Sequence, residues 1–201
     1  MNNILILGAG GPAGIGVIKS LRKTDFDVNI ISVDCDELSV GYHMSDKYFT
    51  IPKVESKNYL DELLRIVKDE KVDLILPTTE RDIIEISKNK DKFDDVILFM
   101  SDYETIMDCT DKWRFYDKCK DVFPLPKTFK GEYGDLRNYV FKKPISGSGS
   151  RGCKKINISD ETSWKEFEEP NILYSEYLPG QEYTIDVLCD MDSNPLVTVP
   201  R

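Results

Sequence analysis

Short apolar runs alternate with segments of helical spacing over the first half of the chain, which restricts this half to a layered α/β fold. Residues 3–7 (NILIL) have the pattern of a buried strand, the glycine-rich run GAGGPAGIG follows, and a helix begins near residue 15. The other expected strands are 28–33, 48–51, 72–76 and 96–100, and the expected helices between them are 59–69 and 80–87. Strands separated by helices predict a parallel sheet that is covered on both faces.

The glycine-rich turn between Gly8 and Gly16 has two interpretations. With Asp34 downstream, it resembles the nucleotide-binding turn of short-chain dehydrogenases, in which the aspartate would hold an adenosine ribose. That alternative needs a catalytic Tyr-x-x-x-Lys, and Tyr116 and Lys120 have this spacing within a charged helical stretch. Close packing of a strand against a helix also requires small residues here, and the helix start is a place for a substrate or a phosphate. We expect a structural or substrate-binding turn rather than a dinucleotide site.

The residues Thr78, Thr79 and Glu80 follow a predicted strand directly. They fall at the carboxyl edge of the sheet, where such folds bind ligands. A helix N-cap with an acidic first turn explains the same residues equally well.

Composition narrows the classes of function. The net charge is −9; residues 1–108 hold 13 Lys and Arg against 21 Asp and Glu, and residues 109–201 hold 14 against 15. This acidity opposes nucleic-acid binding, and the absence of a long apolar run opposes membrane insertion. Five scattered cysteines and the single histidine, His43, predict a reducing, cytoplasmic setting without structural zinc or disulfides.

The stretch FKKPISGSGSRGC, residues 141–153, concentrates glycines, serines and positive charge in one loop. Free backbone N–H groups, hydroxyls and fixed cations are the groups that hold a phosphate chain. A surface Gly/Ser turn is the alternative for such a run taken alone. Strands are expected at 139–143 and 153–158, which makes the loop the tip of a hairpin.

The remaining elements of the second half are short. Helices are expected at 102–107, 111–119 and 161–167, and strands at 172–178, 182–189 and from 196 onward.

The order of four motifs resembles the ATP-grasp superfamily. A D-K pair is followed by P-L-P, then K-P-x-x-G-S-G-S-R-G, then S-E-Y-L-P-G-Q-E-Y-T-I-D-V, from about residue 109 to the end. The pattern is most similar to carbamoyl-phosphate-synthase-like and amino-acid-ligating enzymes. The resemblance implies an α/β chain with a Rossmann-like pre-ATP-grasp domain at 1–108, the first α+β lobe at 109–180 and the start of a truncated second lobe at 181–201.

The resemblance also assigns an ATP site. Lys143 matches the family's lysine on the α- and β-phosphates, a task for which a compact ammonium charge is suited. Lys142 is expected in solvent on the opposite face of the strand. Lys112 matches an earlier basic position near the phosphates, although a surface helix charge explains it too. The residues expected to close over the β- and γ-phosphates are Ser146, Gly147, Ser148, Gly149, Ser150, Arg151 and Gly152.

The hinge between the two lobes is expected at Glu176, Tyr177 and Leu178, where the family reads adenine. Glu182 matches the residue that accepts hydrogen bonds from the ribose hydroxyls, with an exposed strand-start glutamate as the alternative. Asp186 alternates with Glu182 and is expected to face the same cleft.

The resemblance implies the activity of an ADP-forming ligase, which phosphorylates a small carboxylate and joins it to an amine or ammonia. A homo-oligomer is a further expectation for such an enzyme. The family's magnesium ligands come from later strands, and no Glu-x-Asn pattern follows the hinge. We therefore expect a truncated, inactive chain without a metal site of its own, a hypothesis that robust ADP formation would refute. A non-catalytic nucleotide-binding or interaction module is the competing hypothesis.

Overall fold

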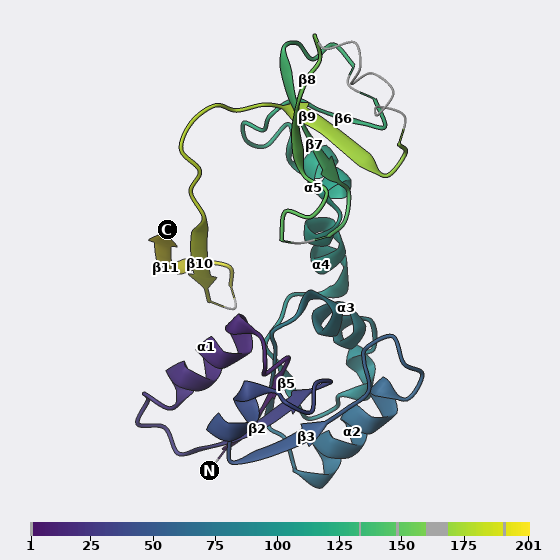
Figure 1. Ribbon diagram of the computed structural model, residues 1–201. Helices are drawn as coiled ribbons and strands as arrows, with labels where there is room; N and C mark the ends of the chain where they lie inside the picture. Colours follow the sequence, from purple (N-terminus) through teal and green to yellow (C-terminus); the bar gives the residue numbers. More distant parts are fainter. Residues whose placement is uncertain (1, 133, 148, 160–168, 191) are drawn as a thin grey trace. The chain divides into compact units, whose positions relative to one another are not determined.

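The chain forms two compact units, Met1–Lys118 and Cys119–Arg201, called here the first and second units (Figure 1). The computed structural model describes residues 2–132, 134–147, 149–159, 169–190 and 192–201. The helix expected at 161–167 and the site residue Ser148 lie outside the described residues.

The first unit is built on a five-stranded, all-parallel sheet in the order β3-β2-β1-β4-β5. The parallel sheet predicted from the sequence is thus confirmed. Its strands are β1 (Asn2–Leu7), β2 (Val28–Asp34), β3 (Lys47–Thr50), β4 (Leu74–Pro77) and β5 (Ile97–Leu98).

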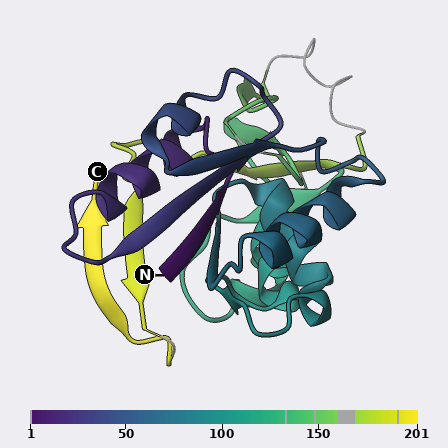
Figure 2. The same cartoon turned by 90° about the horizontal axis from the view of Figure 1, so that it is seen from below.

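Helices cover both faces of this sheet (Figures 1 and 2). In strand β1, Leu5 and Leu7 belong to one buried cluster, and Ile4 and Ile6 belong to another. Each face of the sheet therefore has its own hydrophobic core. Helix α1 packs on the second cluster through Ile18, while α2 and α3 pack on the first. The helical segments are α1 (Pro12–Leu21), η1 (Val40–Met44), α2 (Tyr59–Asp69), α3 (Glu80–Lys88), η2 (Lys90–Lys92), α4 (Tyr103–Thr110) and α5 (Lys112–Cys119).

Local sequence explains where these helices begin. Helix α1 has Pro12 in its first turn after Gly11, a position that tolerates the missing N–H of proline. Thr79 caps α3 by accepting a hydrogen bond from the Asp82 amide, and Asp102 caps α4 in the same way. Within the described residues, no helix is both long and apolar enough to cross a membrane.

The strand order reverses at β1, which creates a switch point at the carboxyl edge of the sheet. The connection from β1 leads to β2 on one side, and the chain later returns to place β4 on the other side. The loops after the two neighbouring strands therefore diverge and leave a crevice, which is where open α/β sheets bind ligands.

The second unit contains a four-stranded antiparallel sheet in the order β6-β9-β7-β8. One face holds a buried cluster that includes Val140, Ile156 and Tyr174. Strands β7 and β8 form a hairpin, so the predicted placement of the glycine-rich loop at a hairpin tip is confirmed. The strands are β6 (Thr128–Lys130), β7 (Tyr139–Pro144), β8 (Lys154–Asn157) and β9 (Ile172–Glu176).

A separate two-stranded sheet ends the chain. Strands β10 (Ile185–Cys189) and β11 (Pro195–Pro200) pair antiparallel with each other. Their residues are exposed, the apolar side chains of Ile185 and Leu196 included. The strand expected from residue 196 is therefore an edge strand, and its partner is the preceding strand of the same chain.

Several expected boundaries differ from the observed ones. The strand expected at 96–100 is only Ile97–Leu98, because β5 pairs on one side alone. The strand expected at 172–178 ends at Glu176, the last residue opposite β7, and the strand expected at 182–189 begins at Ile185. Strand β6 was not expected, because three residues are too few to show a period.

Candidate functional site

The described residues of the loop between β7 and β8, 145–147 and 149–153, have the backbone geometry of an open, glycine-dependent turn. Gly147, Gly149 and Gly152 have φ values of +121°, +68° and +74°, and Ser150 also lies in the left-handed region at +55°. A Cβ on Gly147 or Gly149 would meet no atom of the described residues within 4 Å. These glycines are therefore required by backbone conformation rather than by crowding, and the space beside them is open to a ligand.

Lys143 lies on β7 directly before this loop and is half-buried. It is opposite Leu173 of β9, on the face that also carries Phe141. Lys142 points to the opposite face, as expected, but it is not in solvent: its side chain is 14% exposed, and its Nζ lies 3.4 Å from Glu169 Oε1. The expectation that Lys142 is solvated is wrong, because the residue lies beside the core of the sheet and can reach an acidic partner there.

The expected hinge residues end strand β9. Glu176 is exposed and its backbone N–H donates to the Lys127 carbonyl at 2.8 Å. Tyr177 is half-buried and Leu178 is 63% exposed. The structure thus places these residues at the end of the sheet that lies away from the glycine loop.

The other predicted residues have separate environments. Glu182 is exposed, and Asp186 on β10 accepts a hydrogen bond from Arg201 Nε at 2.7 Å, so its charge is partly compensated. Lys112 begins α5 in the first unit, directly after Asp111, which caps that helix through the Trp113 and Arg114 amides.

A pocket of about 530 Å³ opens at the carboxyl edge of the parallel sheet, entirely within the first unit. It lies at the switch point, between the loops that follow β1, β2, β3 and β4. Its lining residues are Leu7, Gly8, Gly10, Gly11, Val33, Asp34, Cys35, Asp36, Leu38, Ser39, Val40, Ile51, Pro52, Lys53, Val54, Glu55, Tyr59, Thr79, Arg81 and Asp82. Neither Tyr116 nor Lys120 is among them.

Asp34 is already engaged with the glycine turn. Its Oδ2 accepts from the Gly10 N–H at 2.7 Å and its Oδ1 from the Asp36 N–H at 3.0 Å. In a dinucleotide-binding protein, the pyrophosphate would lie against the Gly10 amide. Here the Asp34 carboxylate already accepts from that amide, and its negative charge would repel a pyrophosphate. This geometry disfavours the dehydrogenase interpretation of the turn.

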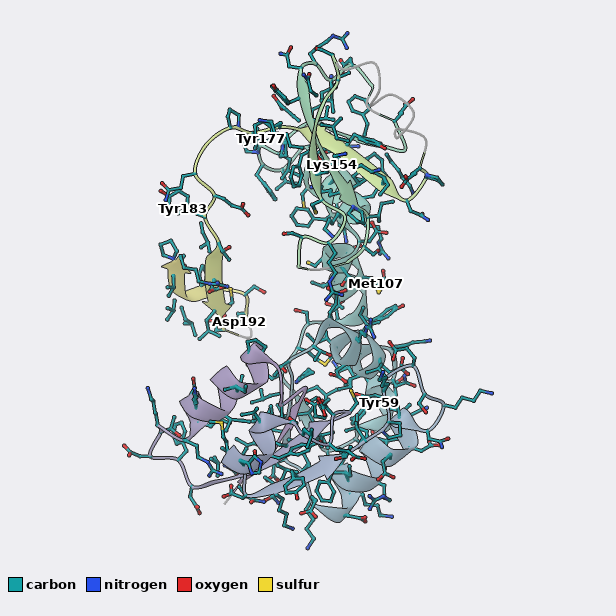
Figure 3. The ribbon with its side chains drawn as sticks, viewed as in Figure 1. Tyr59, Met107, Lys154, Tyr177, Tyr183 and Asp192 are labelled. Atoms are coloured by element: carbon teal, nitrogen blue, oxygen red, sulfur yellow. The ribbon has the colours of Figure 1, made fainter. Side chains whose placement is uncertain are left out.

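A buried hydrogen-bonded pair forms the floor of the pocket. The Tyr59 hydroxyl donates to Asp82 Oδ1 at 2.5 Å, and Thr79 Oγ1 donates to Asp82 Oδ2. Tyr59, labelled in Figure 3, is 2% exposed and Asp82 is 6% exposed. Burial, followed by the charge of Asp82, raises the pKa of Tyr59, so the phenol keeps its proton.

The pocket carries more negative than positive charge. Its acidic side chains are Asp34, Asp36, Glu55 and Asp82, against Lys53 and Arg81. Arg81 is paired with Glu55. The balance favours neutral or cationic groups of a ligand over phosphates.

Two domain families match the chain. Residues 4–99 match the PylC-like, N-terminal domain, and residues 109–201 match the ATP-grasp domain. Residues 109–201 belong to the ATP-grasp domain family. No curated protein matches the sequence significantly.

Solved ATP-grasp structures share this fold at low sequence identity. An N5-carboxyaminoimidazole synthetase from Staphylococcus aureus, complexed with ADP, has a TM-score of 0.75 at 17% identity over 96% of this chain and 52% of its own. An L-amino acid ligase from Bacillus licheniformis has a TM-score of 0.70 at 13% identity, over 94% and 47%. A biotin carboxylase from Campylobacter jejuni has 0.65 at 14%, over 96% and 49%. The chain thus spans about half the length of these structures.

The ATP-grasp motifs were visible in the sequence, but the Tyr59–Asp82 pair was not predicted from it. The two residues are 23 positions apart, and only the sheet brings the start of α2 against the first turn of α3. The pattern Thr79-x-x-Asp82 was the available signal, since a cap residue and an acid three positions later interact reciprocally.

Asp82 should make stability depend on pH in an identifiable direction. Burial is the largest cause that raises the pKa of Asp82 above the ordinary 3.8, and the charges of Asp34 and Glu55 raise it further. The hydrogen bonds from Thr79 and Tyr59 lower the pKa, but by less. Because the folded pKa is the higher one, the stabilisation from this group is complete below pH 3.8 and is lost as pH rises through the folded value.

In urea unfolding between pH 4 and 7, the free energy of unfolding of wild type minus that of Asp82→Asn should therefore fall with rising pH. Using the difference cancels the titration of the groups that do not interact with Asp82. A difference that stays flat or rises would show that Asp82 does not titrate in this way.

Proposed function

We propose that this chain supplies the nucleotide-binding part of an ADP-forming ATP-grasp ligase that joins a small carboxylate to an amine or ammonia. The observation that carries the proposal is the β7–β8 hairpin of the ATP-grasp domain. Lys143 stands at the end of one strand, and the loop that follows needs three left-handed glycines and has open space around two of them. In the proposed reaction, ATP phosphorylates the carboxylate and the amine then displaces phosphate from the acyl phosphate.

The residues of the chain have distinct tasks in this proposal. The Lys143 ammonium neutralises the α- and β-phosphates, and the amides of the glycine loop come close to the terminal phosphates because the glycines carry no side chain. The adenine lies at Glu176–Leu178, at the other end of the same sheet. Neutralising the phosphate oxygens lowers the cost of transferring the terminal phosphoryl group.

Magnesium is the metal that such reactions use with ATP. Among the residues that the structure describes, no three His, Cys, Asp or Glu side chains are grouped so as to hold a metal ion. The donor set present does not fit a complete magnesium site, and the proposed tasks of Lys143 and the loop do not depend on one.

The cysteines support a cytoplasmic location as part of the proposal. All five belong to the described residues, and all five are free thiols. Free thiols persist in a reducing compartment.

Calorimetric titration of the 201-residue chain with ATP and with NADH tests the class of function. We expect binding of ATP and none of NADH, because Asp34 occupies the glycine turn. NADH binding that is abolished in Asp34→Ala would instead establish the dehydrogenase alternative. Binding of ATP is common to the ligase and to a non-catalytic nucleotide-binding module. Carboxylate-dependent release of ADP would favour the ligase, and it would also overturn the expectation that this chain is inactive.

A further inference from the structure

Lys155 on β8 has its ammonium between two tyrosine rings. The Nζ atom lies 4.1 Å from the ring centroid of Tyr139 and 4.0 Å from that of Tyr177. The two rings meet edge to face, with centroids 6.3 Å apart. One exposed lysine therefore joins strand β8 to the start of β7 and to the end of β9.

Strand register places Lys155 on the same face as Lys143. Lys155 is directly opposite Phe141, and side chains opposite each other in an antiparallel pair share a face, as do alternate residues of one strand. From the hinge end to the loop end, this face presents Tyr177 beside Tyr139, then Phe141 with Lys155, then Lys143. Lys155 thus lies between the proposed adenine position and Lys143, the lysine of the α- and β-phosphates.

A nucleotide laid along this face has its sugar and α-phosphate at the level of Lys155. In the proposed pose the base is at the Tyr177 end and the terminal phosphates are at the glycine loop. The successive side chains Phe141 and Lys143 are two strand residues apart, about 6.6 Å. In this pose Lys143 and Lys155 therefore approach the α-phosphate from different sides, Lys155 from the side of the sugar.

The present partners of Lys155 are easily exchanged. A lysine ammonium at an exposed site is held only weakly by an aromatic face. Among the described residues, the structure gives Lys155 these two rings and no ion pair with a carboxylate. A phosphate oxygen offers a full negative charge and a stronger, charge-assisted hydrogen bond.

We propose that Lys155 is a phosphate-binding residue of the nucleotide site, held on Tyr139 and Tyr177 until a nucleotide arrives and then bonded to the α-phosphate. This inference rests on the proposed nucleotide binding. The tyrosine pair keeps the ammonium near the site, so little side-chain ordering remains when the phosphate binds.

Ligand-observed NMR titration with ATP, AMP and adenosine tests the assignment in Lys155→Met, Lys155→Arg and Lys154→Met. Lys154 is the matched control, since it is the adjacent residue on the other face of the same strand. We expect Lys155→Met to weaken ATP and AMP about tenfold, the size of one charge-assisted hydrogen bond, and to leave adenosine unchanged. Lys155→Arg should retain most of the affinity, and Lys154→Met should match wild type.

The outcomes separate this inference from the proposed function. If wild type binds ATP and Lys155→Met matches Lys154→Met, the Lys155 assignment is overturned and nucleotide binding stands. If adenosine weakens as much as AMP, Lys155 acts through the hinge tyrosine and not through phosphate, which also overturns it. If wild type binds neither ATP nor AMP, both proposals are overturned.

Discussion

Replacing Gly8 with alanine should lower the free energy of unfolding of the first unit by about 3 kcal/mol. Gly8 directly follows strand β1 and has φ at +70°, a conformation that costs an L-residue about 1–2 kcal/mol. An added Cβ would also lie 2.4 Å from Thr79 Cγ2 and 3.0 Å from Thr78 Oγ1. Both side chains belong to the short β4–α3 connection, so they cannot move away without disturbing the sheet. Urea denaturation followed by circular dichroism measures the loss.

Gly16→Ala is the matched control for this prediction. Gly16 lies within α1 without a positive φ, and a Cβ there would meet no atom within 4 Å in the part of the chain that the structure describes. Alanine should stabilise this helix by about 0.5–1 kcal/mol. Adding Thr79→Ser to Gly8→Ala removes the clashing methyl group and should restore part of the stability, but not the part due to φ. Equal effects at Gly8 and Gly16 would contradict the argument.

The periodicity of the first half was sufficient to predict the parallel sheet. Helix α2 occupies the predicted residues, Tyr59–Asp69, because its apolar positions repeat at helical spacing over three turns. A strand buried on both faces has a continuous apolar run in its sequence, as Ile4–Leu7 of β1 shows. Long, regular elements are predictable because each turn or residue pair repeats the same signal.

Short or edge elements lack that repetition. Strand β6 exists because Thr128 and Ser175 exchange a buried hydrogen bond at 2.9 Å and the backbone of β9 supplies a ladder. Ser175 and the rest of β9 are remote from β6 in the sequence, so no local pattern predicts this pairing. The misjudged environment of Lys142 has the same cause: alternation gives its face, whereas the Glu169 carboxylate that it meets is set by tertiary structure.

The two candidate sites differ in how far the sequence predicts them. The glycine hairpin is a local motif, and its position after a lysine-bearing strand is visible in a dozen residues. The acidic pocket needs loops from four strands, and residues such as Tyr59 and Asp82 enter it only because parallel strands end at one edge. A local phosphate-binding motif can therefore be predicted from one sequence, whereas a pocket built from several loops can be identified only when the fold is known.

Lys143→Ala should weaken ATP binding about 10- to 100-fold, the largest loss expected of any single side chain in the proposed site. One charge-assisted hydrogen bond to phosphate contributes about 1.5–3 kcal/mol, and each 1.4 kcal/mol corresponds to a factor of ten in affinity. The loss should shrink at high salt, because the lost interaction is between charges near solvent. Calorimetric titration of wild type and variant at two salt concentrations measures both effects.

Lys142→Ala is the control, since it removes the same charge from the adjacent residue of β7 on the opposite face. Its Nζ is near Glu169 and its side chain is largely covered, so the substitution should affect stability while leaving ATP affinity within about twofold of wild type. Titrations well below the unfolding temperature keep the two effects apart. Equal losses of affinity in the two variants would mean that general positive charge, and not a lysine directed at the phosphates, attracts the nucleotide. A loss confined to Lys143→Ala would assign the phosphate side of the site to the face that bears Phe141, Lys143 and Lys155.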